Sequence, residues 1–157
     1  MVDGGTYNRK TVTGMGLMKA GKIQYRTLGC FYTDPTITVE IDIRPHSKKN
    51  NINLCSRGAV PIAILGSDTF WVNDINTETL RFAEARVKVV GRKDPHQLCR
   101  YRDVNHDDIQ DLVCLFFTTD IAALDGESIT ATVNGELFDE TPIEGTDRVH
   151  IVKSSCY

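Results

Sequence analysis

The segment Thr36-Ile-Thr-Val-Glu-Ile-Asp-Ile43 alternates polar and apolar residues along its whole length. Successive side chains of a β-strand point to opposite faces, so the four β-branched apolar residues would line one face and the polar residues the other. This pattern predicts a half-buried β-strand, and Pro45 marks its end.

Short runs of similar character recur along the rest of the chain, separated by Gly, Asn, Asp and Pro. We expect strands over residues 60–65, 79–82, 85–90, 96–102, 112–118, 128–133, 136–138 and 148–152. Pro61 should lie at a strand start or a sheet edge, because proline lacks the N–H that a central strand donates. Asn134-Gly135 is a strong hairpin signal and predicts a tight turn before 136–138. Many short strands, without a clear amphipathic helix, predict an all-β fold: an antiparallel β-sandwich, immunoglobulin-like or jelly-roll-like.

Residues 1–34 differ from the rest, because they are Gly-rich, polar and weakly patterned. We therefore expect an N-terminal strand-forming arm over 1–34 and a β-sandwich domain over 35–157. Segments 11–18 and 22–28 flank Lys-Ala-Gly and could form a loose hairpin. The arm could lie on its own domain, add a strand to a neighbouring subunit, or form the first hairpin of the same sandwich. Its expected contact residues are Val12, Met15, Leu17, Ile23 and Tyr25.

The most informative motif is Asp103-Val-Asn-His-Asp-Asp-Ile-Gln-Asp-Leu112. Oxygen-bearing side chains fall at loop positions 1, 3, 5 and 9, which is the ligand spacing of a D-x-[DN]-x-D-G-x-x-D calcium loop. The alternative is an acidic, solvated turn that binds no metal. The expected Ca²⁺ ligands are the side chains of Asp103, Asn105, Asp107 and Asp111 and the main-chain carbonyl of Ile109.

Two positions depart from this loop pattern. Position 6 is usually Gly because the turn there needs a positive φ, and here it is Asp108, which adopts that conformation at some cost. Position 12, which carries a bidentate Glu in helix–loop–helix sites, is Cys114. The apolar run over 112–117 is rich in strand formers, so we expect a calcium loop that leads into a strand.

The chain has five cysteines and no C-x-x-C pair, which argues against a zinc site. Cys99 and Cys114 lie almost symmetrically about the acidic loop. If the loop joins two antiparallel strands, these cysteines would lie nearly opposite one another and could form a disulfide; two buried thiols are the alternative. Cys30 and Cys156 could tie the termini together or link neighbouring copies.

Length, composition and charge limit the class of protein and the partners that it could bind. A chain of 157 residues, 41% hydrophobic and 25% charged, has the make-up of one soluble globular domain. The net charge of −3 and the lack of a basic cluster argue against nucleic acid. No apolar run approaches the ~20 residues that span a membrane. The N-terminus lacks the apolar core of a signal peptide, so a secreted form would have lost its signal or carry it outside this sequence.

Three blocks between residues 39 and 145 resemble a β-sandwich module of secreted and surface proteins of environmental bacteria and archaea. The blocks are Ile41-Asp-Ile-Arg-Pro-His-Ser47 with Ile52-Asn-Leu-Cys-Ser-Arg-Gly58 and Val60-Pro-Ile-Ala-Ile-Leu-Gly66, then 103–112, then 135–145 with Asp147 and Val149. The resemblance implies a β-sandwich, calcium and an extracellular or cell-surface location, and it implies no catalytic role. The chain departs from the pattern at His46, His106 and Asp108.

Catalytic motifs are weak. The segment Gly16-Leu-Met-Lys-Ala-Gly-Lys-Ile23 lacks the final Ser or Thr of a phosphate-binding loop. The four histidines are scattered, and neither G-x-S-x-G nor H-E-x-x-H occurs. We therefore expect that the protein is not an enzyme.

The main alternative function, carbohydrate binding, depends on Trp71. With Phe70 and Tyr101 it could form an aromatic sugar-binding platform, although core packing beside Val72 and Ile75 is the interpretation we favour. The sequence thus predicts an extracellular, calcium-stabilised structural protein: a repeating subunit of a surface filament or similar assembly, built by donor-strand contacts with copies of itself. The alternative is a calcium-dependent carbohydrate-binding or adhesion module of a larger secreted protein, with glycans as partners.

Overall fold

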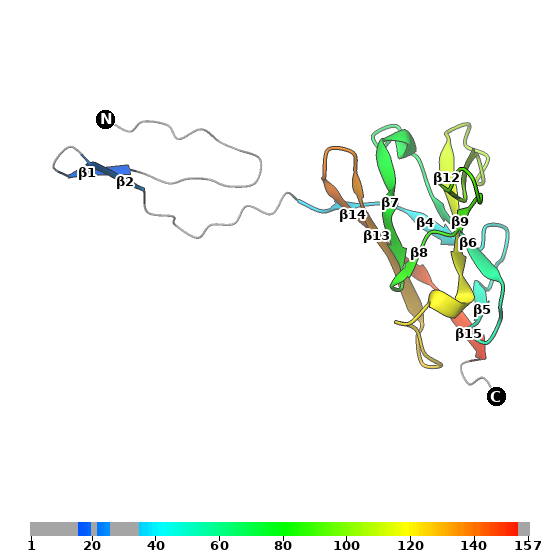
Figure 1. Ribbon diagram of the computed structural model, residues 1–157. Coiled ribbons are helices and arrows are strands. Elements are labelled where there is room, and N and C mark those ends of the chain that lie inside the picture. The colour runs from blue at the N-terminus through cyan, green and yellow to red at the C-terminus, as the bar shows by residue number, and fades with distance from the viewer. Residues whose placement is uncertain (1–15, 20–21, 26–34, 154–157) are drawn as a thin grey trace. The chain divides into compact units, whose positions relative to one another are not determined.

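The computed structural model describes residues 16–19, 22–25 and 35–153. The chain divides into two compact units, Met1–Pro35 and Thr36–Tyr157. In the first unit, β1 (Gly16–Lys19) pairs antiparallel with β2 (Lys22–Tyr25), as Figure 1 shows. The antiparallel pairing expected on either side of Lys-Ala-Gly is therefore present.

Three of the expected arm contacts, Leu17, Ile23 and Tyr25, lie in these two strands. The other two, Val12 and Met15, lie outside the described residues, as do Cys30 and Cys156.

The regular elements in the described part of the second unit are strands and two short 3₁₀ turns. The strands are β3 (Ile37–Thr38), β4 (Ile41–Ile43), β5 (Asn51–Asn53), β6 (Ala59–Ile64), β7 (Ile75–Phe82), β8 (Ala85–Arg86), β9 (Val89–Val90), β10 (His96–Gln97), β11 (Cys99–Arg102), β12 (Asp111–Phe117), β13 (Thr130–Leu137), β14 (Pro142–Arg148) and β15 (His150–Lys153). The turns are η1 (Val72–Asp74) and η2 (Thr118–Asp120). Among the described residues, no helix has the length and apolar character needed to cross a membrane.

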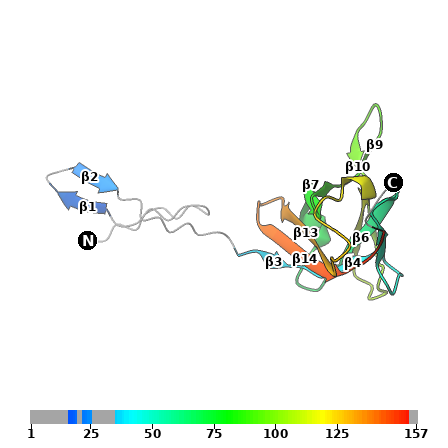
Figure 2. The same cartoon turned by 90° about the horizontal axis from the view of Figure 1, so that it is seen from below.

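Two main sheets form the sandwich. One has the order β11-β12-β6-β4 and the other β3-β14-β13-β7-β8, and Figures 1 and 2 show them as two facing layers. The pairs β9–β10 and β5–β15 lie beside them. Pairing is antiparallel except between β3 and β14 and between β5 and β15. The expected all-β sandwich is thus confirmed.

The core lies between the two sheets. From Leu112 onward every second residue of β12 is buried, which places Leu112, Cys114 and Phe116 on the inner face. Phe116 meets Phe82 of β7 with 5.7 Å between the ring centroids, so this aromatic pair joins the two layers.

The alternating segment 36–43 has the predicted faces but is not one strand. Val39, Ile41 and Ile43 are buried, yet β3 belongs to one sheet and β4 to the other. The chain crosses between the layers here, since the Val39 N–H donates to the Glu144 carbonyl while Leu65 N–H donates to the Glu40 carbonyl. Two strands in two sheets therefore replace the single strand expected.

The prediction of a hairpin at Asn134-Gly135 is wrong. β13 runs through both residues, and the chain turns only after it, before β14. The pairing of β13 with β7 has a register shift between Asn134 and Glu136. A Cβ on Gly135 would lie 2.7 Å from Leu80 Cδ2, so this glycine permits close packing against β7 rather than a turn.

Pro61 lies in β6, a central strand with β12 on one side and β4 on the other. At Pro61 the pairing with β4 has already ended. Its carbonyl accepts from Arg44 N–H, and β4 ends one residue earlier, at Ile43. Because the N–H and C=O of a strand residue point to the same side, the missing proline N–H faces the side on which β4 has ended. The expected edge is therefore local to Pro61.

Candidate metal-binding loop and aromatic groove

The acidic loop joins β11 to β12, with Arg102 opposite Asp111 as its closing pair. Asp103 organises the loop, because its Oδ1 accepts the N–H of His106 at 2.6 Å and its Oδ2 accepts that of Asp108 at 3.1 Å. Asp103 occupies position 1 of the loop, and the backbone of the following five residues wraps around its carboxylate.

Two further predicted ligands belong to the same hydrogen-bonded cluster. Asn105 Nδ2 donates to Asp107 Oδ2 at 2.8 Å, and the Ile109 N–H donates to Asp107 Oδ1 at 2.8 Å. Asp103, Asn105 and Asp107 are therefore linked through one short stretch of backbone.

The loop contains two residues with positive φ, His106 at 66° and Asp108 at 65°. The positive φ that the motif requires at position 6 is thus present without glycine. The conformation costs free energy for a residue with a Cβ, and the hydrogen bonds that Asp103 accepts offset that cost.

Asp111 is fully buried and has a different role from the other acidic residues. Its Oδ1 accepts the N–H of Gly66 at 2.9 Å, and its Oδ2 accepts the N–H of Val104 at 2.8 Å. A buried carboxylate with two charge-assisted hydrogen bonds anchors the loop to the end of β6.

Gly66 completes this anchor. A Cβ at this position would lie 2.3 Å from the Gln110 carbonyl oxygen, which is closer than any side chain permits. Only glycine therefore lets the loop approach the end of β6 this closely, although its φ does not require glycine.

The donor set fits a hard cation only in part. Carboxylate and amide oxygens are the ligands that Ca²⁺ prefers. In the described part of the chain, however, no three His, Cys, Asp or Glu side chains are placed to hold a metal ion together. Asp103, Asn105 and Asp107 come together, whereas Asp111 is engaged with Gly66 and Val104. To bind Ca²⁺, Asp103, Asn105 and Asp107 would have to give up some of their hydrogen bonds within the loop and turn their oxygens to the cation.

Hydrogen bonding lowers the pKa of Asp103, the first residue of the loop. Desolvation raises the pKa of Asp103, but the N–H groups of Asp108, His106 and Asp107 and the charge of His106 together outweigh it, so the pKa is lowered. A carboxyl whose pKa is lowered on folding stabilises the folded state above its unfolded pKa of about 4. That contribution is lost as the pH falls through the folded pKa.

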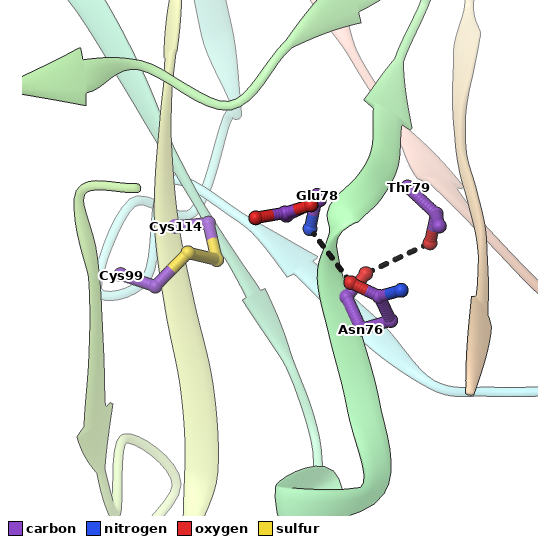
Figure 3. Close-up of a disulfide and its surroundings, with 5 residues drawn as sticks. All are labelled: Asn76, Glu78, Thr79, Cys99 and Cys114. Carbon is purple, nitrogen blue, oxygen red and sulfur yellow. Dashed lines mark hydrogen bonds between the residues drawn. A yellow bond between two sulfur atoms is a disulfide. The ribbon is translucent and has the colours of Figure 1, made fainter. Parts of the chain in front are cut away.

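Cys99 and Cys114 form a disulfide across β11 and β12, where they are directly opposite in the register, as Figure 3 shows. Cys114 belongs to the buried core, and Cys99 packs against that core. Figure 3 also shows the hydrogen bonds of Asn76 with Glu78 and Thr79, which shape the irregular part of β7. Cys55 is disulfide-bonded as well.

Trp71 is 68% exposed, so the core packing favoured from the sequence is wrong for this side chain. Its neighbour Val72 takes the buried position at the start of η1, and Phe70 is half-buried. The pattern of alternating apolar residues does not extend through a 3₁₀ turn, where consecutive side chains are about 120° apart.

Trp71 borders a cavity of about 370 Å³ that also touches the acidic loop. Phe70 and Asn73 line it on one side, and Asp108 and Gln110 line it on the other. Tyr101, on β11, is exposed but does not line this cavity. The structure therefore brings together Trp71 and Phe70 of the expected platform, without Tyr101.

Two surface features do not follow from the sequence patterns. The sequence predicts a strand over 136–138, but Phe138 lies in the turn after β13 and is 70% exposed. The outward residues of β12 are also apolar, and the uninterrupted run Leu112–Phe117 was the available signal, since such runs are typical of strands covered on both faces.

Comparison of the chain with protein-family models, with curated proteins and with solved structures finds no match.

Proposed function

We propose that the chain is an extracellular structural subunit that assembles with copies of itself through its N-terminal arm. The division of the chain at Pro35 carries this proposal. The second unit builds its own two-layer core, while the first contains a separate strand pair. A strand-forming arm, in a chain whose sandwich has its own core, suits donation to a neighbour.

Charge supports the same proposal. Residues 1–35 contain five Lys or Arg and two Asp, a formal charge of +3, so the total of −3 leaves −6 on residues 36–157. A basic arm and an acidic sandwich attract one another between copies, which accelerates association at low salt.

The first strand after the arm in the sequence, β3, offers a template for a further strand. β3 has two residues and is one of the two edge strands of its sheet, paired among the described residues only with β14. Unpaired N–H and C=O groups on such an edge can accept a further strand. A donated strand could therefore extend this sheet.

Deleting residues 1–28 should abolish self-association and leave a folded sandwich. Sedimentation velocity of the full chain and of the deletion variant measures assembly, and far-ultraviolet circular dichroism with thermal melting checks the fold. Self-association of the truncated chain as strong as that of the full chain would contradict the role of the arm.

An oxidising, extracellular environment accords with the Cys99–Cys114 disulfide, because disulfides are rare where thioredoxin and glutathione keep thiols reduced. The proposal places the assembly at the cell surface or outside the cell.

Calcium enters the proposal as a stabiliser of the acidic loop. If Ca²⁺ binds only the folded state, a free concentration 100 times its Kd adds about 2.7 kcal/mol. For a chain of this length, that corresponds to roughly 5–10 °C in Tm. Calorimetry in millimolar Ca²⁺ and in a chelator should show this shift, and Asp103→Ala should remove it.

Asp125→Ala is the matched control. Asp125 is an exposed carboxylate that accepts the N–H of Glu127 and the hydroxyl of Ser128, so the variant loses similar bonds in another loop. It should keep the full calcium response. A wild-type Tm that is the same in chelator and in Ca²⁺ would refute the calcium assignment.

The exposure of Trp71 favours a second candidate function, carbohydrate binding in adhesion. An exposed indole stacks on the apolar face of a sugar, and Asn73 and Gln110 beside it offer amide groups to hydroxyls. Binding on a glycan array should disappear in Trp71→Ala and persist in Tyr101→Ala, an exposed aromatic residue outside the cavity. An array without any bound glycan would count against this candidate.

A further inference from the structure

The outer face of the β11-β12-β6-β4 sheet contains an apolar groove of about 440 Å³. Its floor comprises Pro61, Leu98, Val113 and Leu115, all of them half-buried. We call this surface the β12 groove. Because β12 also places apolar residues in the core, it is apolar on both faces, as is typical of strands that are covered on both sides.

The rim of the β12 groove is basic. Arg100 and Arg102 extend from β11 as exposed residues, and His46 lies at the margin formed by the turn after β4. An apolar floor with two guanidinium groups beside it suits a partner that combines an apolar side chain with carboxylates.

The turn between β13 and β14 has this complementary chemistry. Phe138 is 70% exposed at the turn, and Glu136, Asp139 and Glu140 surround it in the sequence. We call residues 136–140 the Phe138 turn. An exposed aromatic residue close to the exposed carboxylate of Glu136 could fill an apolar groove and place that carboxylate at its arginines.

The Phe138 turn is also held in a defined conformation. The Phe138 N–H donates to the Asp74 carbonyl at 2.8 Å, and the Leu137 N–H donates to the Thr141 carbonyl at 2.9 Å. Glu140 closes the turn with a φ of 70°. A turn that is ordered before binding loses little conformational entropy when it docks.

We propose that the Phe138 turn of one copy docks in the β12 groove of the next copy. Charge distinguishes this occupant from the N-terminal arm, whose formal charge of +3 would be repelled by the arginine rim, whereas the Phe138 turn is acidic. The inference rests on the self-assembly proposed above but uses a different surface. Because the turn and the groove are different surfaces, the contact can repeat head to tail and so propagate into a chain of subunits.

Sedimentation velocity of the full chain over a concentration series tests the contact. Phe138→Ala should weaken self-association at least tenfold, whereas Ile129→Ala, which truncates a side chain that is 76% exposed elsewhere, should leave it within twofold of wild type. Arg100→Glu should weaken association as well, and adding Glu136→Arg should restore it. Raised salt should weaken the wild-type contact.

The outcomes separate this contact from the role of the arm. If deletion of residues 1–28 abolishes association while Phe138→Ala associates like wild type, the docking contact is overturned and the arm remains. If Phe138→Ala abolishes association that survives the deletion, the docking contact stands without the arm. A wild-type chain that stays monomeric at every concentration overturns both.

Discussion

Asp111→Ala should lower the free energy of unfolding by about 3 kcal/mol, a large effect for one substitution. The carboxylate is fully buried, and its two oxygens accept the N–H groups of Gly66 and Val104. Alanine would leave both donors without their acceptor, and an unsatisfied buried donor such as the Gly66 N–H costs roughly 1–3 kcal/mol, with a smaller cost at the half-buried Val104 N–H. The loop would also lose its attachment to the end of β6.

Urea unfolding in the presence of a chelator measures this effect without any contribution from calcium. Asp107→Ala is the matched control, because Asp107 is an exposed acidic residue of the same loop whose carboxylate accepts bonds only from within the loop among the described contacts. The control should lose less than about 1 kcal/mol. Equal losses in the two variants would contradict the anchoring role of Asp111.

The paired substitution Cys99→Ala with Cys114→Ala should cost about 3 kcal/mol as well. The disulfide spans 15 residues of sequence, and closing a loop of that length lowers the entropy of the unfolded chain by an amount equivalent to roughly 3 kcal/mol. The bond also clamps the two strands from which the acidic loop emerges. Losing it should therefore weaken the loop together with the whole sandwich.

Denaturant unfolding of the paired variant and the wild type under non-reducing conditions gives the measurement. Peptide mapping of the unreduced wild type should recover the peptides of Cys99 and Cys114 joined together. Equal stability of the two proteins, or recovery of both peptides as free thiols, would contradict the disulfide assignment.

The all-β fold was predictable because alternating polar and apolar residues in the sequence correspond to alternating exposed and buried side chains in a strand. The segment over 112–118 was expected as a strand, and β12 occupies almost all of it with alternate residues buried. The positive φ of Asp108 also follows from the loop motif. These features depend on a few neighbouring residues, which the sequence displays side by side.

Features that depend on distant partners could not be predicted. Gly135 had the local chemistry of a turn, but its environment is set by Leu80, 55 positions away in the sequence. Asp111 had the spacing of a metal ligand, yet its hydrogen bond to Gly66 depends on how β6 and β12 pair. The exposure of Trp71 likewise depends on η1, a short turn without apolar periodicity.

Two proposed contacts, the N-terminal arm and the Phe138 turn in the β12 groove, lead to the same central claim of self-assembly. The most direct measurement is electron microscopy of the purified full chain at near-native concentration in millimolar Ca²⁺. The account predicts regular filaments or an ordered layer with a single repeating subunit. Dispersed single particles under these conditions would contradict it.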